Sequence, residues 1–99
     1  MNELQIIATY SDFLSEVGIP HLVGGSLASS AWGEQRATND ADLLLQFESV
    51  SMERFLKGFP RGFFAEAAEV REAVASDEAF ASFQTLYEQT AFKIDNFIA

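Results

Sequence analysis

The stretch Asp40-Ala41-Asp42-Leu43-Leu44-Leu45-Gln46-Phe47 decides the fold of this chain. Successive side chains of a strand point to opposite faces of a sheet. One face of this stretch is entirely apolar and comprises Ala41, Leu43, Leu45 and Phe47, while the other carries Asp40, Asp42, Leu44 and Gln46. The pattern therefore predicts a strand that buries one face in a core and turns two carboxylates away from it.

The flanking segments predict a small domain that mixes helices and strands. Apolar residues recur at spacings of three and four in residues 2–17, which predicts an amphipathic helix with Leu4, Ile7, Tyr10, Leu14 and Val17 on one stripe. We expect further helices over residues 27–32, 51–57 and 66–75, and further strands over 21–23, 82–87 and 91–98. The order αβαβααββ predicts an α+β (mixed α/β) fold, with a small mixed sheet packed with helices.

Composition narrows the class of protein. A chain of 99 residues with 48% hydrophobic residues and ten Phe fits one packed domain. No apolar run approaches the roughly 20 residues that span a bilayer, and the first residues lack the basic region of a secretion signal, so we expect no membrane association and a cytoplasmic location. The absence of Cys excludes disulfides and thiolate zinc sites. The net charge of -9 weighs against a broad nucleic-acid surface, but it allows a few carboxylates to hold metal ions.

Asp40 and Asp42 are the first candidate site residues. Residues two apart on a strand point to the same side, about 6.6–6.8 Å apart along the chain. Carboxylates this close repel one another unless a cation lies between them, and Mg²⁺ prefers one or two carboxylates together with substrate phosphates. The pair therefore predicts a Mg²⁺ site; the alternative is a solvated strand face.

Asp95 is the candidate third acid. In the last expected strand, Lys93, Asp95 and Phe97 share one face. If this strand pairs beside the strand that begins at Asp40, Asp95 completes a cluster of three carboxylates and Lys93 lies close to it. Such a carboxylate helps bind a metal at an attacking hydroxyl or takes its proton. The alternative is that Lys93 and Asp95 are edge-strand charges in solvent.

A glycine turn precedes the acidic strand. Gly24, Gly25 and Ser26 lie between an expected strand and an expected helix, where glycines let the backbone approach a phosphate and the helix N-terminus attracts its charge. The alternative is an ordinary tight turn with a Ser cap. His21 lies beside this turn and could ligate a metal, but a strand residue with a backbone partner is the favoured interpretation.

The combination of these motifs resembles the DNA-polymerase-β-like nucleotidyltransferase superfamily. The matching residues are Val23-Gly24-Gly25-Ser26, then after thirteen residues Asp40-Ala41-Asp42-Leu43, and later Ile94-Asp95. The run from Gly33 to Asp42 follows the pattern Gly-x-x-Arg-x-Thr-x-Asp-x-Asp, with Lys93-Ile94-Asp95 after it. This pattern resembles that of a bacterial subgroup, which is similar to the AbiEii-like toxins of type IV toxin–antitoxin systems.

The resemblance implies a role for each matching position. Asp40, Asp42 and Asp95 would be the catalytic acids and the ligands of Mg²⁺ or Mn²⁺. Gly24, Gly25, Ser26, Arg36 and Lys93 would contact the nucleoside triphosphate. Arg36 could instead form a surface ion pair with Glu34, and Thr38 would fix the loop.

The implied activity is transfer of a nucleoside monophosphate from the triphosphate to an acceptor hydroxyl, with release of pyrophosphate. RNA and protein are both possible acceptors, and a partner protein or a second copy of the chain could complete the unit. The alternatives are a module that binds a nucleotide or a partner without turnover, and a toxin–antitoxin component that modifies a protein. Residues 1–99 would form the catalytic core, without the C-terminal helical region of larger relatives. Asn96 departs from the family pattern, because relatives usually carry an apolar residue there, and this makes the pairing of the last strand less secure.

Overall fold

The computed structural model describes residues 2–24 and 40–99, with Asp40 described through its backbone alone. The first described element is helix α1 (Glu3–Glu16). Asn2 caps this helix, because its Oδ1 accepts a hydrogen bond from Gln5 N while Gln5 Oε1 accepts one from Asn2 N, each at 2.8 Å. The pair satisfies two backbone donors that a first helical turn leaves without partners. Gly18 follows the C-cap with a φ of 79°, a left-handed conformation that glycine adopts at little cost.

The strands in the described part of the chain form one five-stranded mixed sheet, in the order β1-β2-β5-β4-β3. Their bounds are β1 (His21–Val23), β2 (Asp40–Leu45), β3 (Phe63–Ala65), β4 (Ser82–Tyr87) and β5 (Phe92–Ile98). β5 runs parallel to β2 on one side and antiparallel to β4 on the other. The two outer strands, β1 and β3, are antiparallel to β2 and β4. The last strand in sequence is therefore the central strand of the sheet.

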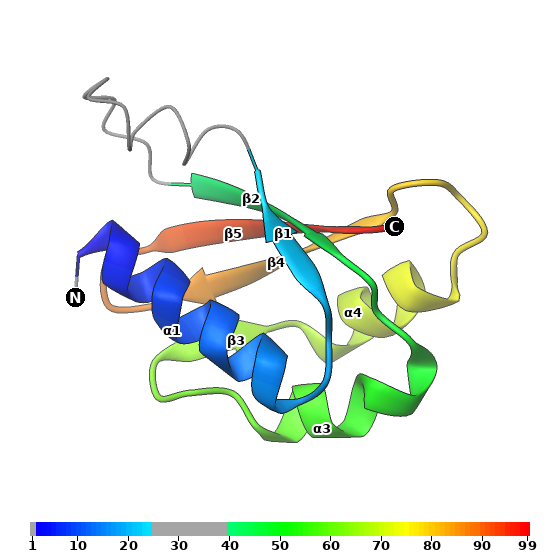
Figure 1. Ribbon diagram of the computed structural model, residues 1–99, viewed down its shortest axis with the longest axis horizontal. Helices are drawn as coiled ribbons and strands as arrows, with labels where there is room; N and C mark the ends of the chain where they lie inside the picture. The colour runs from blue at the N-terminus through cyan, green and yellow to red at the C-terminus, as the bar shows by residue number, and fades with distance from the viewer. Residues whose placement is uncertain (1, 25–39) are drawn as a thin grey trace.

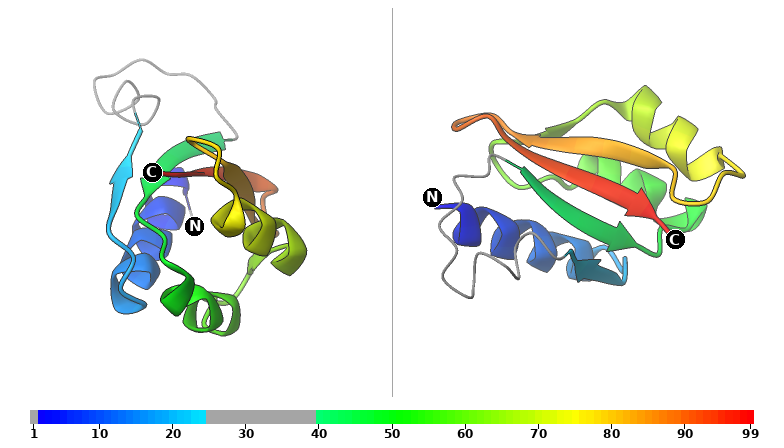
Figure 2. Two further views of the ribbon diagram at one scale, coloured as in Figure 1. Left: turned by 90° about the vertical axis from the view of Figure 1, so that its right-hand side faces the viewer. Right: turned by 90° about the horizontal axis from the view of Figure 1, so that it is seen from above.

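The helices lie on one side of this sheet. A short 3-10 helix, η1 (Ser49–Ser51), leads into α3 (Met52–Lys57), and α4 (Ala67–Ala75) connects β3 to β4. Figure 1 shows α1, α3 and α4 below the sheet, and the view from above in Figure 2 shows β2, β5 and β4 in front of the helices. The described part of the chain thus forms two layers, with one sheet face against the helices and one face turned away from them.

The core fills the space between the two layers. From the strands it takes Ala41, Leu43, Leu45, Phe83, Phe92 and Ile94, and from α1 it takes Ile6, Ile7, Tyr10, Phe13 and Leu14. An aromatic cluster continues it beneath the end of β2, with ring centroids between 4.8 and 6.1 Å apart; its members are Phe13, Phe47, Phe55, Phe59 and Phe83. The expected apolar face of β2 is therefore confirmed as the face that makes the core.

A polar network is buried within this apolar core. Asn96 and Thr85 are both 0% exposed. Asn96 Nδ2 donates to Thr85 Oγ1 at 3.0 Å and to two carbonyl oxygens, those of Phe83 at 3.1 Å and Ile94 at 3.2 Å. The Tyr10 hydroxyl donates to Asn96 Oδ1 at 2.7 Å. Because these groups satisfy one another, Asn96 is accommodated on the core face of β5, and the strand pairs on both sides.

The predicted α+β class is confirmed, with differences in detail, the first of which is that the strand expected over residues 40–47 ends at Leu45. The sequence patterns do not predict β3, because three residues carry too little alternation to mark a strand. The last strand begins at Phe92 rather than at 91, since Ala91 adopts a φ of 56°. Leu4 is 61% exposed, and the buried stripe of α1 includes Ile6 and Phe13 instead. The helix expected over residues 27–32 lies outside the described residues.

None of the helices in the described residues is both long enough and apolar enough to cross a bilayer.

Candidate functional site

The pairing of β2 with β5 brings Asp42 and Asp95 together. The two residues are register partners on adjacent parallel strands, so their side chains leave the same face of the sheet. Each alternates with buried neighbours and is itself half-exposed. Neighbouring strands lie about 4.8 Å apart. Two carboxylates from distant parts of the sequence therefore meet on the sheet face that the helices leave open.

Gln84 adds a third polar group to this face. It is the register partner of Asp95 on β4. Its Nε2 donates a hydrogen bond of 2.9 Å to Asp95 Oδ1. Asp42, Asp95 and Gln84 thus form a row across three adjacent strands, β2, β5 and β4.

Gly24 lies directly against Asp42. Its backbone N–H donates to Asp42 O at 2.6 Å, just beyond the end of β1. A Cβ atom at this position would lie 2.9 Å from Asp42 O and 3.0 Å from Asp42 Cβ, closer than real Cβ atoms normally approach such atoms. Only glycine fits this contact without a shift of the backbone, and the start of the glycine turn is therefore packed against the backbone and Cβ of Asp42.

The structure places only part of the predicted site. Asp40 and Lys93 are register partners that precede Asp42 and Asp95 by two residues on the same two strands. Lys93 is exposed. The other predicted phosphate contacts, Gly25, Ser26 and Arg36, lie outside the described residues. The same holds for the two accessory predictions, the Arg36–Glu34 ion pair and the loop role of Thr38, so these remain predictions.

The carboxylates on this face fit a hard divalent cation by their chemistry. Carboxylate oxygens are the ligands that Mg²⁺ and Mn²⁺ prefer. Among the side chains that the structure describes, which exclude that of Asp40, no three His, Cys, Asp or Glu residues are grouped so that they could hold an ion by themselves. The described side chains on this face bring two carboxylates together, those of Asp42 and Asp95.

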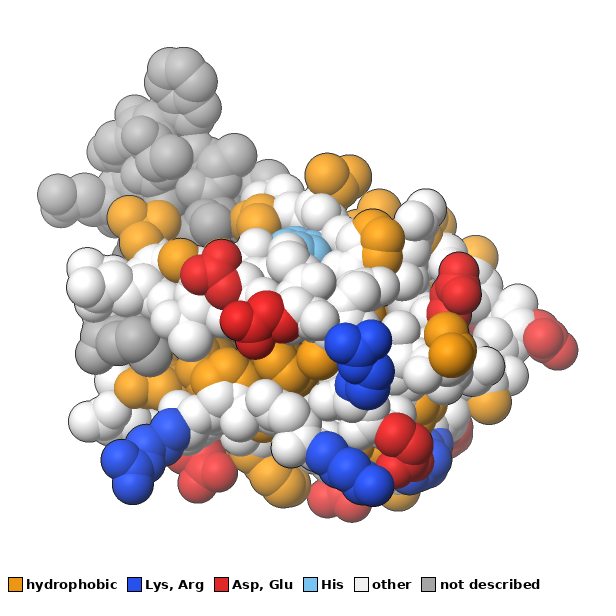
Figure 3. Space-filling view, turned by 60° about the horizontal axis from the view of Figure 1, so that its bottom comes forward, with side chains coloured by type: hydrophobic (Ala, Val, Ile, Leu, Met, Phe, Trp, Pro, Cys, Tyr) orange, Lys and Arg blue, Asp and Glu red, His pale blue; other side chains and the backbone are white. Residues whose placement is uncertain are grey.

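Two basic residues on the helical side, Lys57 and Arg71, pair with one acidic residue, Glu53. Arg71 Nη2 lies 3.0 Å from Glu53 Oε1, and Lys57 Nζ lies 3.5 Å from Glu53 Oε2. The hydrogen bond from Arg71, and then the contact with Lys57, lower the pKa of Glu53. Figure 3 shows that Lys and Arg side chains on this side alternate with Asp and Glu side chains. This surface lacks the concentration of positive charge that a duplex nucleic acid requires.

His21 lies on the opposite side of the sheet from Asp42. Its register partner is Leu45, a core residue. Its Nδ1 lies 3.0 Å from the backbone oxygen of Ile19, and its Nε2 lies 2.6 Å from Ser11 Oγ. The prediction of a strand histidine with a backbone partner is confirmed, and the imidazole ties β1 to α1.

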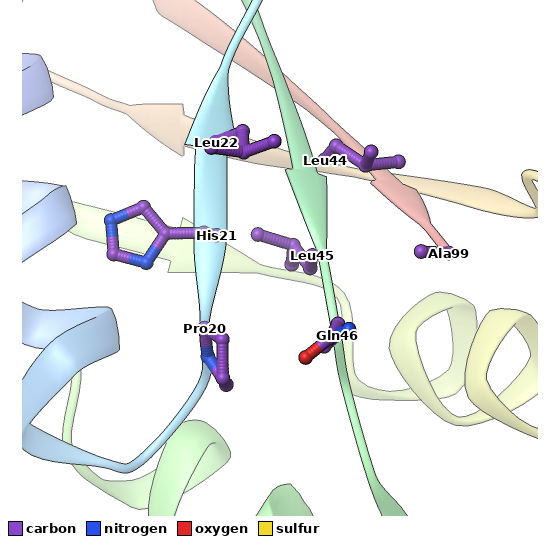
Figure 4. Close-up of a pocket in the computed structure, with 7 residues that line it drawn as sticks. All are labelled: Pro20, His21, Leu22, Leu44, Leu45, Gln46 and Ala99. Atoms are coloured by element: carbon purple, nitrogen blue, oxygen red, sulfur yellow. The ribbon is translucent and has the colours of Figure 1, made fainter.

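An apolar pocket of about 280 Å³ lies further along β1 and β2. Its lining residues are Pro20, His21, Leu22, Leu44, Leu45, Gln46 and Ala99. Figure 4 shows the Leu22 and Leu44 side chains next to each other on the two strands, where they are register partners. Leu22 is 69% exposed. Because Leu44 follows Asp42 by two residues on the same strand, this pocket adjoins the carboxylate pair along one sheet face.

Gln84 and Leu22 are the site residues that sequence patterns did not single out. Gln84 sits in an expected strand, but nothing in that strand indicates which residue of β5 it faces. Strands over 82–87 and 91–98, as expected, leave three residues between them, and a hairpin of that length pairs Gln84 with Ile94; in the structure Ala91 joins the turn and Gln84 pairs with Asp95. Leu22 lies in an expected strand of only three residues, which is too short for its pattern to indicate an exposed side chain on the same face as Asp42.

The chain matches no protein-family model, and comparisons with curated proteins and with solved structures find no match.

Proposed function

We propose that the open sheet face binds a nucleoside triphosphate with Mg²⁺ or Mn²⁺ and transfers the nucleoside monophosphate to an acceptor hydroxyl. The observation that carries the proposal is the register match between Asp42 and Asp95. A sequence motif in one strand and an acid more than fifty residues later meet on one face, beside Gly24. Carboxylates on adjacent strands repel each other in the absence of a cation, so their pairing favours a metal site.

The reaction needs two things from these residues, a fixed triphosphate and a base for the acceptor. The acceptor oxygen forms a bond to the α-phosphorus, and the bond from that phosphorus to the bridging oxygen of the β-phosphate breaks, which releases pyrophosphate. The acceptor proton passes to the Asp95 carboxylate through Oδ2, the oxygen that takes no part in the bond to Gln84. A bound divalent ion supplies charge neutralisation at the phosphate oxygens.

Asp42 has a distinct role in this scheme, next to the glycine turn. Its carboxylate and that of Asp40, two residues earlier on β2, would hold the cation that binds the triphosphate. Gly24 allows the backbone to lie against Asp42, so that phosphate groups could approach both the metal and backbone amides. Lys93, opposite Asp40 in the register and exposed, would offset the remaining phosphate charge.

The apolar pocket gives the nucleoside a place to lie. Residues two apart on a strand are separated by about 6.6 Å. The distance from Asp42 to Leu44 is therefore similar to the length of the sugar and phosphate that join a base to the metal-bound phosphates. Leu22 and Leu44 offer an apolar surface on which the flat face of a base can pack, and the Gln46 side chain offers an amide at the rim. The triphosphate would then run from this pocket toward Asp42 and Gly24.

Labelled nucleotides test the activity directly. ATP, GTP, CTP and UTP labelled at the α-phosphate are supplied with Mg²⁺ or Mn²⁺ to the protein alone, with tRNA and with cell lysate. We expect transfer of label that Asp42→Asn and Asp95→Asn each reduce by at least a hundredfold, because each removes an essential charge. Asp12→Asn is the matched control, since Asp12 is an exposed acid on α1.

The possible outcomes separate the candidate functions. Metal-dependent nucleotide binding without transfer to any acceptor would replace the enzyme with a binding module. Label on a lysate protein, rather than on RNA, would favour the toxin–antitoxin component that modifies a protein. Equal activity in Asp42→Asn and Asp12→Asn would refute the assignment of the site.

A further inference from the structure

The Asp95 carboxylate is held by a neighbour on the next strand. Gln84 and Asp95 are register partners on β4 and β5, and Gln84 Nε2 donates to Asp95 Oδ1 at 2.9 Å. We propose that Gln84 is a positioning residue that fixes the Asp95 carboxylate so that Oδ2 is the oxygen presented to the metal ion and the acceptor hydroxyl. This assignment rests on the proposed function, because it gives a role within that same site.

The chemistry of an amide suits this task. An aspartate side chain at a half-exposed strand position can rotate and present either oxygen. The Gln84 amide occupies Oδ1 and leaves Oδ2 for other partners. Because the amide is neutral, it orients the carboxylate without cancelling the charge that a metal ion or a proton requires. A lysine or arginine in its place would compete with the cation.

Gln84 itself is anchored from the edge of the sheet. The pairing between β3 and β4 ends where Ala65 faces Thr85, so the backbone of Gln84 lies just beyond the last pair. Its N–H donates at 2.8 Å to Oε1 of Glu69, in the first turn of α4. The helix therefore supplies the acceptor that the neighbouring strand no longer provides, and it holds the backbone from which the amide extends.

The core side of the sheet fixes the same pair of residues. Gln84 lies between Phe83 and Thr85, which are 1% and 0% exposed. Asn96, the residue after Asp95, donates from Nδ2 to the Phe83 carbonyl at 3.1 Å. Both strands are thus tied together next to the Gln84–Asp95 contact, which limits the freedom of either side chain to shift.

Two substitutions at Gln84 test the assignment. Gln84→Leu keeps the side-chain size and removes the donor, while Gln84→Asn keeps an amide donor on a shorter side chain. Gln84 is exposed, so both variants should fold, and thermal unfolding checks this. We expect Gln84→Leu to lower kcat about tenfold, as is typical for loss of a group that orients a ligand, with the KM for the nucleotide unchanged. Gln84→Asn should recover part of the loss.

Mn²⁺ binding gives a readout that does not depend on turnover. We expect Gln84→Leu to weaken Mn²⁺ binding, measured by electron paramagnetic resonance, by about tenfold. Ser82→Ala is the matched control, because Ser82 is an exposed polar residue on the same strand and face. Glu69→Ala should shift Mn²⁺ binding in the same direction but less, while Glu72→Ala, one turn along the exposed side of α4, should not.

The results distinguish a failure of this assignment from a failure of the function. If Asp95→Asn abolishes transfer while Gln84→Leu matches Ser82→Ala in both kcat and Mn²⁺ binding, the positioning role is overturned and the enzyme assignment stands. If Asp42→Asn and Asp95→Asn leave transfer unchanged, the proposed function is overturned instead. A loss in Gln84→Leu that is confined to thermal stability would also overturn the positioning role.

Discussion

The Tyr10 hydroxyl of α1 donates a 2.7 Å hydrogen bond to Asn96 Oδ1 of β5, and both side chains are 0% exposed. The contact joins the first helix to the central strand of the sheet across 86 residues of sequence. Asn96 directly follows Asp95 on β5, so their side chains point to opposite faces of the sheet. The buried contact therefore fixes Asn96 on the core face, and this places Asp95, the candidate third acid, on the open face. The hydrogen bonds of one side chain therefore support the placement of its neighbour.

Asn96→Leu should destabilise the protein, although it puts an apolar residue on the core face of β5. It removes the acceptor of the Tyr10 hydroxyl and the donor to Thr85 Oγ1. Leaving buried polar groups without partners costs about 1–3 kcal/mol. Urea unfolding measures this, and the double variant Tyr10→Phe/Asn96→Leu should lose less than the sum of the single variants. Additive losses would show that the two side chains are not coupled.

Tyr10 should make the fold sensitive to alkaline pH. Burial raises the pKa of its phenol above the usual value near 10, against the opposing effect of the hydrogen bonds with Thr85 and Asn96. The folded state therefore holds this proton more tightly than the unfolded state. The resulting stability is complete below about pH 10 and is lost as the pH rises from there through the folded pKa, at about 1.4 kcal/mol per pH unit.

Comparison with Tyr10→Phe isolates this contribution. Urea unfolding is measured for both proteins from pH 8 to pH 11.5. We expect the wild type to be more stable at pH 8 and its advantage to shrink above pH 10, because the variant has no phenol at this position and the other titrating groups are shared. A constant difference across this range would contradict the assignment of the shift to Tyr10.

The sequence determined most of this fold where side chains alternate over long strands. The apolar residues Ala41, Leu43 and Leu45 mark a core face, and they are buried at 1%, 1% and 0% exposure. The short strand β3 (Phe63–Ala65) could not be predicted in this way. It has a buried residue on each side of one exposed residue, and three residues are too few to establish an alternating pattern. Its position depends on pairing with β4, which is a tertiary contact.

The acidic residues of the candidate site could be predicted from the sequence, but the residues that contact them could not. The acidic positions on β2 and β5 follow from strand alternation, and their register confirms that Asp42 and Asp95 face each other. The partner of Asp95 depends on one backbone angle, the φ of 56° at Ala91, which lengthens the turn before β5. Alanine rarely adopts this conformation, so no local preference indicates it. A shift of one residue would have turned Gln84 away from Asp95.

Leu22→Ser tests the placement of the nucleoside in the apolar pocket. Leu22 is 69% exposed, so its replacement should change the free energy of unfolding by no more than about 0.5 kcal/mol. Loss of an apolar contact with the base should raise the KM for the nucleotide about tenfold with little change in kcat, because the contact is the same in the ground state and the transition state. Initial rates at varied nucleotide concentration measure this.

Val50→Ser is the control for Leu22→Ser. Val50 is also a strongly exposed apolar residue, at 79%, but it lies in η1, away from β1 and β2. It should leave KM unchanged. Equal KM values in the two variants would place the nucleoside elsewhere on the protein.

Gly24→Ala should damage the site through the backbone rather than through any lost side chain. The new Cβ would lie 2.9 Å from Asp42 O, an atom of the strand itself, so β1 and β2 must separate at this point. Overpacking of this kind costs about 1–3 kcal/mol, and the displacement of Asp42 should weaken metal-dependent nucleotide binding by at least tenfold.

Gly18→Ala is the matched control, because its new Cβ would face no atom within 4 Å but the residue would be strained by its φ of 79°, at about 1–2 kcal/mol. Calorimetric titration with a non-hydrolysable nucleotide then separates the two glycines. If both variants lose stability and only Gly24→Ala loses nucleotide affinity, the close approach to Asp42 belongs to the binding site; if both bind like the wild type, Gly24 serves only the turn.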